Sequence, residues 1–439
     1  MLMIIFFVDK NLKNLPLSEI LDIEKIKDVN KPIERANGLP NECYINNDYL
    51  AHEKERIFFD KWTVIGVASS IPNPGDAKPH NLLGIPLILV RDKNMRIRVF
   101  HNVCSHRGFK LLDKQCSLKN VIRCPYHSWS YDFNGKLMAT PHIGGLNNHQ
   151  SENFDKTKSN LKEIKTKVWM DIIFVNINSN EIKFDEYIQP LENRWSKFIN
   201  KGDHKSLVHS NDYGYFNLDV KCNWKFAIEN YCESYHLPTI HPELNKVSNI
   251  DDHYHIQGLP NRFAGQGSKK YEQPIKGNKK FNTFPNWDKG MLKNSEYIAL
   301  FPNVMIGLHI DHFYVFWLEP LAMNKTKEHM HMYYVGNESA NGHELKELRK
   351  ENSRFWKDVM LEDVNAIEGM QSTLQNHKPQ LSIEISIPIK QREILFNLLM
   401  SFGYDLFRKI EKGFPSFDPS MEIPDDHYFY LYAASSLVT

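Results

Sequence analysis

The sequence predicts an α+β protein, with a small all-β domain near the N-terminus and a larger domain built on an antiparallel sheet. Residues 62–144 consist of short β-type runs separated by turn residues. Residues 297–335 form apolar and aromatic runs broken by turn signals. Residues 344–374 are rich in Glu, Lys and Leu and contain few helix breakers. These three stretches together define the fold class.

Individual elements follow from apolar periodicity and from the turn residues between them. A helix is expected where Trp224, Ala227, Ile228 and Tyr231 recur at helical spacing. The expected elements, in chain order, are strands at 62–68, 85–90, 96–100, 168–177 and 207–220, a helix at 223–235, three or four antiparallel strands within 297–335, and helices at 344–374 and 391–400.

Length and composition place the chain among ordinary globular proteins. Its 439 residues suffice for two or three domains, and 41% hydrophobic with 24% charged residues is a normal balance. The net charge of +1 gives no basic excess, so we do not expect a nucleic-acid partner. The apolar run at residues 1–8 is too short for a signal peptide or a membrane span, and we expect a buried strand there.

Cysteine usage bears on the cellular compartment. Six cysteines without a secretory signal indicate a reducing, cytoplasmic environment, and no window approaches the roughly 20 apolar residues of a membrane span, so we expect a soluble protein. Four of the six have no assigned role: Cys43, Cys116, Cys222 and Cys232.

The strongest local signal is Cys104-Ser-His106, followed later by Cys124-Pro-Tyr-His127. Each loop offers one Cys and one His, whereas a structural zinc site usually takes like ligands from one loop. A Rieske [2Fe–2S] centre needs this division, since two Cys hold one iron and two His hold the other. A zinc-ribbon variant is the alternative.

A second metal site is indicated by Glu233-Ser-Tyr-His236 and by His241 five residues further on. The two histidines would not share a face of a continuous helix. Pro238 is expected to end the helix near His236, so that His241 can turn back towards the same metal. Two histidines and one carboxylate form the facial triad of non-haem Fe(II) sites.

The third ligand should come from elsewhere in the chain. Asp363, on the long C-terminal helix, is the preferred candidate, but Glu362 and Glu368 are open alternatives on composition alone.

Together the two motifs resemble the oxygenase α subunit of the Rieske non-haem iron oxygenases, over roughly residues 39–374. The resemblance implies residues 45–165 as the Rieske domain, 166–439 as a helix-grip catalytic domain, and 1–44 as a segment packing on the latter. It also implies a head-to-tail homotrimer. The implied cluster ligands are Cys104, His106, Cys124 and His127, and the implied ligands of mononuclear Fe(II) are His236, His241 and Asp363.

In such a trimer an acidic residue relays electrons between a cluster of one subunit and the iron of the next, and the matching position is Glu233. Relatives that oxidise aromatic rings mostly carry Asp there. Glu, like the segment 301–312, resembles the branch acting on quaternary ammonium compounds such as betaines and carnitine. Aromatic residues available for a cation–π site are Tyr235, Phe301, Phe313, Phe316 and Trp317.

Because the chain has no glycine-rich dinucleotide fingerprint, the resemblance implies electrons from NAD(P)H through a separate flavin and iron–sulfur reductase, with O2 as co-substrate. Three hypotheses follow from the sequence. The first is hydroxylation or demethylation of a small quaternary ammonium compound, and the second is ring-hydroxylating dioxygenation of an aromatic acid or hydrocarbon. The third is a non-catalytic electron-transfer or zinc protein.

Overall fold

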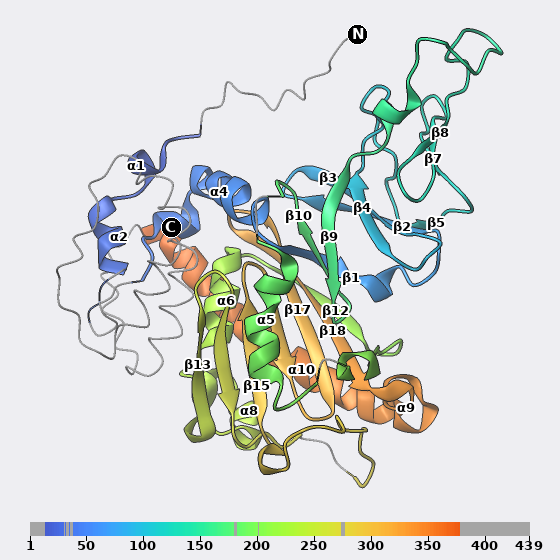
Figure 1. Ribbon diagram of the computed structural model, residues 1–439. Helices are drawn as coiled ribbons and strands as arrows, with labels where there is room; N and C mark the ends of the chain where they lie inside the picture. Colours follow the sequence, from blue (N-terminus) through green and yellow to red (C-terminus); the bar gives the residue numbers. More distant parts are fainter. Residues whose placement is uncertain are drawn as a thin grey trace.

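A computed structural model of the chain describes residues 14–29, 31, 35, 38–179, 182–200, 202–273 and 277–377 (Figure 1). The expected strand at 1–8 and the expected helix at 391–400 lie outside the described residues. Within the described ranges, no helix is both long enough and apolar enough to cross a membrane.

The N-terminal β domain contains a seven-stranded sheet and a small three-stranded sheet. In spatial order the larger sheet consists of β1 (Thr63–Val67), β10 (Ile172–Asn176), β9 (Glu163–Trp169), β4 (Ile97–His101), β3 (Ile85–Arg91), β2 (Asp76–Leu82) and β5 (Cys116–Ser117). The smaller sheet consists of β6 (Ile122–Arg123), β7 (Ser130–Tyr131) and β8 (Leu137–Ala139). The strands expected at 62–68, 85–90 and 96–100 are confirmed as β1, β3 and β4.

The single strand expected at 168–177 is wrong, because this stretch contains the turn of a hairpin between β9 and β10. Met170 and Asp171 occupy the turn with positive φ values of 48° and 68°. Two consecutive residues in this region form the turn that matches the twist of paired strands. The apolar run conceals the turn, because neither residue is Gly or Asn.

The second domain is built on an eight-stranded antiparallel sheet. In spatial order it consists of β11 (Leu207–His209), β18 (Lys325–Val335), β17 (His312–Ala322), β16 (Val304–Leu308), β15 (Ser295–Leu300), β14 (Phe263–Ser268) and β13 (His253–Leu259), with β12 (Tyr215–Val220) also paired to β18. The strands expected within 297–335 are confirmed as four, β15 to β18. The strand expected at 207–220 is instead two strands, both paired to β18.

Helices cover both faces of this sheet (Figure 1). The helix α5 (Phe184–Trp195), which the sequence analysis does not anticipate, lies on one face, and α6 (Trp224–Cys232) and α10 (Lys346–His377) lie on the other. The helix expected at 344–374 is confirmed as α10. Pro190 inside α5 is a helix-breaking signal, which explains why the sequence pattern hides this helix. The remaining α-helices are α1 (Leu17–Ile20), α2 (Ile23–Val29), α3 (Glu42–Ile45), α4 (Asn47–Glu53), α7 (Leu237–Ile240), α8 (Pro242–Val247) and α9 (Gly336–Asn341).

Asn303 joins the two large sheets. Its side-chain oxygen accepts a hydrogen bond from the backbone N–H of Val64 at 2.9 Å. Its side-chain nitrogen donates to the carbonyls of Val64 at 2.9 Å and Leu318 at 2.8 Å. Since β1 is the edge strand of its sheet, Asn303 satisfies backbone groups that would otherwise lack partners inside the protein.

Candidate metal centres

The first candidate centre lies at the tip of the β domain, where two loops have the same backbone geometry. In the first loop, Cys104 N–H donates to the carbonyl of Phe109 at 2.8 Å, and Gly108 N–H donates to the carbonyl of Cys104 at 2.9 Å. Gly108 has a positive φ of 74°, which glycine adopts without steric cost.

The second loop repeats these contacts. Cys124 N–H donates to the carbonyl of Trp129 at 2.8 Å, and Ser128 N–H donates to the carbonyl of Cys124 at 3.0 Å. Ser128 takes the position of the glycine with a φ of 58°. The two loops therefore present their cysteines in equivalent backbone positions, as a cluster held from two sides requires.

The four expected ligands lie together at this tip. The ring centroids of His106 and His127 are 4.7 Å apart, and Trp129 stacks on His106 at 4.5 Å. Both thiols are buried, and the Cys104 sulfur lies 3.3 Å from the hydroxyl of Tyr131. The Nδ1 atom of His127 is buried and has no hydrogen-bond partner among the described residues. Two buried thiols beside an imidazole nitrogen with unused bonding capacity fit a Cys/His-ligated cluster.

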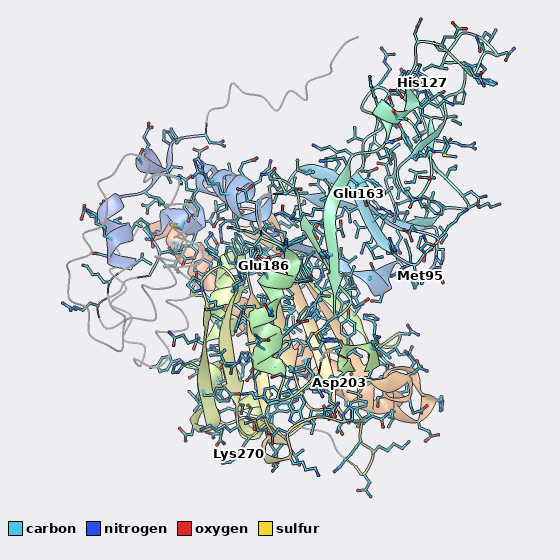
Figure 2. The ribbon with its side chains drawn as sticks, viewed as in Figure 1. Met95, His127, Glu163, Glu186, Asp203 and Lys270 are labelled. Atoms are coloured by element: carbon cyan, nitrogen blue, oxygen red, sulfur yellow. The ribbon has the colours of Figure 1, made fainter. Side chains whose placement is uncertain are left out.

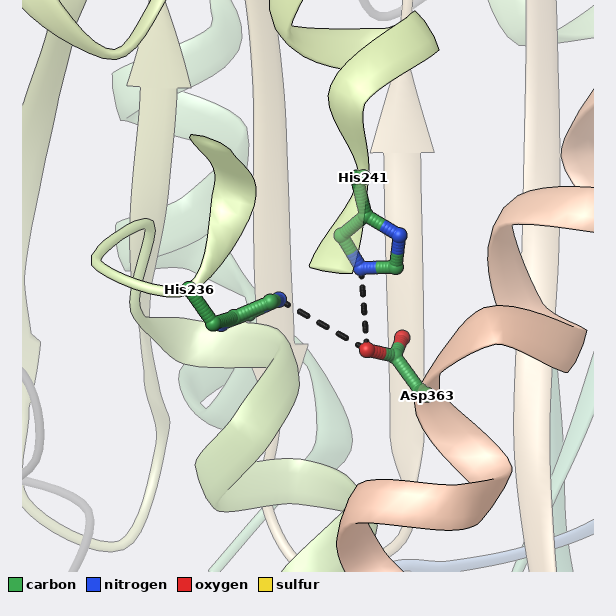
Figure 3. A group of neighbouring side chains, drawn as sticks. All are labelled: His236, His241 and Asp363. Atoms are coloured by element: carbon green, nitrogen blue, oxygen red, sulfur yellow. Dashed lines mark ion pairs between the residues drawn. The ribbon is translucent and has the colours of Figure 1, made fainter. Parts of the chain in front are cut away.

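The second candidate centre brings together His236, His241 and Asp363, as Figure 3 shows. The Nε2 atoms of His241 and His236 lie 2.9 Å and 3.6 Å from Oδ1 of Asp363. One possible ligand atom from each residue lies within 4.8 Å of the other two. Oδ1 of Asp363 is buried and makes no hydrogen bond of good geometry to any described residue. Two imidazoles and one carboxylate converging in this way fit the facial triad of non-haem iron.

The chain course around the histidines differs from the sequence prediction. The helix α6 ends at Cys232, and Glu233 is already extended, with φ −119° and ψ 156°. Pro238 does not end this helix but lies in the first turn of the next one, α7. Proline is favoured at that position because its fixed φ suits a helix start and its missing N–H would be unpaired there. His236 precedes α7 and His241 follows it.

Glutamates bind the outer nitrogens of both imidazoles. Nδ1 of His236 lies 2.5 Å from Oε1 of Glu233, and Nδ1 of His241 lies 2.8 Å from Oε2 of Glu362. Burial lowers the pKa of His241, but the adjacent carboxylates of Asp363 and Glu362 outweigh burial and raise the pKa overall. A divalent metal would compete with that proton for Nε2.

The structure distinguishes among the three acidic residues that the sequence offers as candidates for the third ligand. Within the described residues, only Asp363 joins the group formed by the two histidines. Glu362, one residue earlier on α10, instead contacts the far nitrogen of His241. Glu368 accepts a hydrogen bond from the backbone N–H of Lys221 at 2.8 Å and so lies outside the group.

The aromatic residues beside this centre are mostly not those expected. Side chains alternate along β17, so Phe313 and Trp317 point to the α5 face while Tyr314 points to the α10 face. The hydroxyl of Tyr314 lies 3.1 Å from that of Tyr231 on α6, and its ring lies 4.8 Å from Trp356 on α10. The alternation along β17 could have been predicted from the sequence, which separates its side chains into two faces. Which of these faces borders the triad is decided only by the packing of α10.

The other expected aromatic residues are either exposed or part of the hydrophobic core. Tyr235 is 55% exposed, and Phe301 and Phe316 are buried in the core on the α10 side of the sheet. Four aromatic residues outside the expected set lie against one another between the sheet and the helices α6 and α10: Tyr231, Tyr297, Tyr314 and Trp356.

Both domains of the chain match known protein families. Residues 61–150 match the Rieske [2Fe-2S] domain, and residues 209–409 match the ring hydroxylating alpha subunit (catalytic domain). The carnitine monooxygenase oxygenase subunit of Acinetobacter pittii is 26% identical over 343 residues, which cover 77% of this chain and 85% of the relative. The chloroplastic choline monooxygenase of Arabidopsis thaliana is 24% identical over 370 residues, covering 81% and 82%.

Among solved structures, a quaternary ammonium Rieske monooxygenase in complex with L-carnitine has the same fold. It superposes with a TM-score of 0.66 at 23% identity and covers 84% of this chain and 96% of the other.

A Rieske domain joined to this type of catalytic domain defines an oxidoreductase that incorporates oxygen from O2. The chain belongs to the Rieske non-haem iron oxygenases, as an oxygenase α subunit. Its cofactors are accordingly a Rieske [2Fe–2S] cluster and a mononuclear iron.

Proposed function

We propose that this protein hydroxylates a C–H bond beside the nitrogen of a small quaternary ammonium compound of the betaine or carnitine type. The observation that carries this proposal is the group of aromatic side chains around Tyr314, whose ring lies near Asp363. Tyr314 lies between Tyr231 and Trp356 on the face of the sheet that borders Asp363. The faces of such rings attract a quaternary ammonium cation, which cannot accept or donate ordinary hydrogen bonds.

The relatives support the same substrate class. The carnitine and choline oxygenases match this chain across both domains, over 77% and 81% of its length. Glu233, where we expect aromatic-ring oxygenases to carry Asp, points to the same branch. A ring-hydroxylating activity on aromatic acids remains the alternative that the experiment below must test.

The metal ligands in this proposal are the two groups described above. His236, His241 and Asp363 would hold the iron, and the Cys/His pairs of the two tip loops, Cys104 with His106 and Cys124 with His127, would hold the cluster. When bound, the iron would supply O2 activation and the cluster would supply electrons one at a time. Glu233 and Glu362 orient the imidazoles by binding Nδ1 and thereby leave Nε2 free for the metal.

The overall reaction balances with two electrons and two protons. One oxygen atom of O2 enters the C–H bond, and the other leaves as water. Hydroxylation of an N-methyl group gives a carbinol that breaks its C–N bond, releasing formaldehyde and a proton and leaving a tertiary amine. Hydroxylation of the chain carbon beside nitrogen instead gives a carbinol that breaks into an aldehyde, trimethylamine and a proton. The electrons would come from NAD(P)H through a separate flavin and iron–sulfur reductase.

The active unit in this proposal is a head-to-tail homotrimer. In one chain, His127 lies at the tip of the β domain, well away from the large sheet of the catalytic domain (Figure 2). Phe109 and Tyr126 beside it are 44% and 54% exposed in the single chain. Because aromatic residues are enriched in interfaces, these two side chains support a subunit contact at the tip. We place this tip against the exposed Tyr235 and the neighbouring Glu233 of the next subunit, so that Glu233 relays electrons between the cluster and the iron.

The domain limits are also part of the proposal. Strand β9 spans residue 165, the expected end of the Rieske domain, and β10 completes the same sheet. We therefore extend the Rieske domain from 45–165 to Asn176 and begin the catalytic domain of 166–439 after it. We also assign the segment 1–44 to the catalytic domain, because Tyr44 at its end stacks on Phe226 of α6 with a centroid distance of 4.4 Å.

A single-turnover assay tests the proposed function. The iron-loaded protein is reduced, the reductant is removed, and O2 is added with carnitine, glycine betaine, choline or benzoate. Formaldehyde or trimethylamine from a quaternary ammonium compound, in proportion to enzyme, is the expected result. A diol from benzoate with neither product would overturn the proposal in favour of ring hydroxylation. Zinc in place of iron and acid-labile sulfide would contradict both activities.

A further inference from the structure

His309, at the turn between β16 and β17, is a buried polar residue that the mechanism above does not use. Its side chain is 1% exposed, and neither ring nitrogen has a hydrogen-bond partner among the described residues. An imidazole must present at least one N–H and one further nitrogen, and burying such groups unpaired is unfavourable. Unpaired buried groups of this kind occur where a protein binds a polar ligand.

The neighbouring histidine differs in this respect. His312 stacks on His309 with a centroid distance of 4.1 Å and an interplanar angle of 5°. Its Nδ1 lies 2.6 Å from Oδ1 of Asp311, and its Nε2 accepts a hydrogen bond from the indole N–H of Trp356 at 3.1 Å. Both nitrogens of His312 are therefore occupied, and only His309 has free bonding capacity in this pair. Burial and the nearby His312 hold the pKa of His309 well below 6.5, so its ring is neutral.

A second unpaired polar group lies next to His309. The ring centroid of Tyr271 is 4.4 Å from that of His309, and its hydroxyl is buried without a partner among the described residues. A neutral imidazole and a phenol each supply one hydrogen-bond donor. Two adjacent donors suit a carboxylate, which has two oxygens and accepts such bonds strongly.

The helix α10 relates this pair to the triad. His309 lies 5.2 Å from the ring of Trp356, measured between centroids. Trp356 and Asp363 are seven residues apart on α10, which places them on the same helix face, about 10 Å apart along the axis. The ring centroids of Tyr297 and Tyr314 lie 5.5 Å and 6.0 Å from that of His309, so both rings are its neighbours on the sheet side.

We propose that His309 and Tyr271 bind the carboxylate of a zwitterionic substrate whose quaternary ammonium group lies among the aromatic rings nearer the triad. This inference rests on the proposed function and narrows it, because it selects carboxylate-bearing compounds such as carnitine or γ-butyrobetaine over choline. The aromatic rings recognise the cation that all these compounds share. The two donors recognise the group that only some of them have, which gives specificity.

The test is anaerobic calorimetry on the full-length, iron-loaded protein, with γ-butyrobetaine and choline as the two probes. Without O2 there is no turnover, so binding is measured alone. We expect His309→Phe and Tyr271→Phe each to weaken γ-butyrobetaine binding by about 10- to 100-fold, the effect of losing a hydrogen bond to a charged group. Choline binding should change by less than about threefold, because choline makes no such bond.

A matched control is Tyr254→Phe, which removes a hydroxyl from the opposite side of the same sheet, where it donates to Glu296. It should leave both affinities unchanged. Variants that bind γ-butyrobetaine as tightly as the wild type would overturn the carboxylate site while leaving the proposed function intact. Equal losses for both probes would assign His309 and Tyr271 to packing alone. A wild type that binds neither probe but converts benzoate would overturn the proposed function itself.

Discussion

Each imidazole of the mononuclear centre has one nitrogen bound by a glutamate and the other directed towards Asp363. Glu233 takes Nδ1 of His236, Glu362 takes Nδ1 of His241, and the Nε2 atoms lie 3.6 Å and 2.9 Å from the Asp363 carboxylate. A hydrogen bond to one nitrogen fixes the tautomer and the ring orientation, so the other nitrogen is presented as a metal ligand. The chemistry at this scale depends on single atoms, and single substitutions can test it.

Replacing Asp363 with Ala should remove the mononuclear iron and abolish turnover while leaving the Rieske cluster in place. The physical reason is that two neutral imidazoles alone bind Fe(II) too weakly without the anionic ligand. Iron and acid-labile sulfide analysis of the purified variant measures both sites. The control is Asp358→Ala on the same helix, whose side chain is 55% exposed. Full iron content in Asp363→Ala would exclude Asp363 as a ligand.

Replacing Glu233 with Gln should slow electron delivery while both metals stay bound. Glu233 bonds Nδ1 of His236 and also accepts a hydrogen bond from the backbone N–H of Tyr235. Removing such an orienting carboxylate reduces activity by roughly 10- to 100-fold. Stopped-flow oxidation of the reduced cluster in the presence of O2 and substrate reports the rate. Glu243→Gln, with a 67% exposed side chain, is the control, and an unchanged rate in Glu233→Gln would exclude the relay.

At the scale of the elements, α6 is held in place by a buried polar network that fixes the start of the triad segment. Lys225 and Glu53 of α4 form an ion pair at 2.8 Å, and both side chains are fully buried. Tyr44 of α3 donates a hydrogen bond to Glu229 at 2.7 Å. Breaking such buried pairs is strongly unfavourable, because each leaves a polar group without a partner. The N-terminal helices therefore position the segment that presents His236 and His241.

Glu229 should make the stability of the protein fall as pH rises from about 4.5 to 7. Burial raises its pKa from 4.5 to about 7, although the hydrogen bond from Tyr44 lowers it. Below pH 4.5 the carboxyl is protonated in both the folded and the unfolded chain, so it adds no pH dependence. Between 4.5 and 7 the folded chain retains a proton that the unfolded chain has lost, which penalises folding increasingly up to pH 7.

The variant Glu229→Gln should lack this penalty and should be more stable than the wild type at pH 8, by up to about 3 kcal/mol. At pH 4, where both forms of Glu229 are neutral, the two proteins should differ little. Urea unfolding midpoints at the two pH values measure the change. Glu347→Gln, with a 75% exposed side chain, serves as the control. Identical pH slopes in the variant and the wild type would show that Glu229 is ionised in the folded protein.

At the scale of the whole molecule, two domains with separate cofactors must keep a fixed geometry. Asn303, which hydrogen-bonds Val64 of β1 and Leu318 of β17, joins the Rieske-domain sheet to the catalytic sheet. The tip loops project from the other end of the β domain, where aromatic side chains are exposed (Figure 2). In the proposed trimer, this junction would therefore determine where the cluster meets another subunit.

Replacing Asn303 with Ala should destabilise the protein by about 3 kcal/mol or more, because three backbone groups lose hydrogen-bond partners at a buried junction. Thermal unfolding and limited proteolysis between the domains measure the effect. Asn376→Ala, which removes only an exposed contact to Ser372, is the control. A variant with unchanged unfolding and protease resistance would show that the junction is held by other contacts.

The proposed trimer should sediment at about three times the chain mass of 51.5 kDa. Phe109→Asp at the tip should lower this mass and the turnover together, because it introduces a charge into the proposed interface. Met95→Asp, at a side chain that is 51% exposed but distant from the tip, should change neither (Figure 2). Analytical ultracentrifugation decides the matter, and a wild-type monomer at working concentration would contradict the assembly.

The sequence alone determined the features that depend on neighbouring residues. The spacing of Cys104 with His106 and of Cys124 with His127 places each pair on one tight turn, whatever the rest of the chain does. The apolar and aromatic runs of β17 and β18 likewise predict strands from local sequence alone. His236 and His241 are only five residues apart, so the folded chain keeps them near each other. Even so, the hairpin at Met170 and Asp171 was missed, since a lone Asp within an apolar run is a weak turn signal without Gly or Asn beside it.

The tertiary structure decided everything that depends on how distant elements pack. Asp363, Glu362 and Glu368 are equivalent in composition, and only the rotation of α10 against the sheet turns Asp363 to the histidines. The same packing decides that Tyr314, not Phe313, borders the site, and it leaves the His309 side chain buried with no hydrogen-bond partner in the described part of the chain. Successive residues of a helix point in directions 100° apart, so adjacent residues such as Glu362 and Asp363 face different neighbours. Which of them faces the histidines depends on how the helix packs and cannot be predicted from the local sequence.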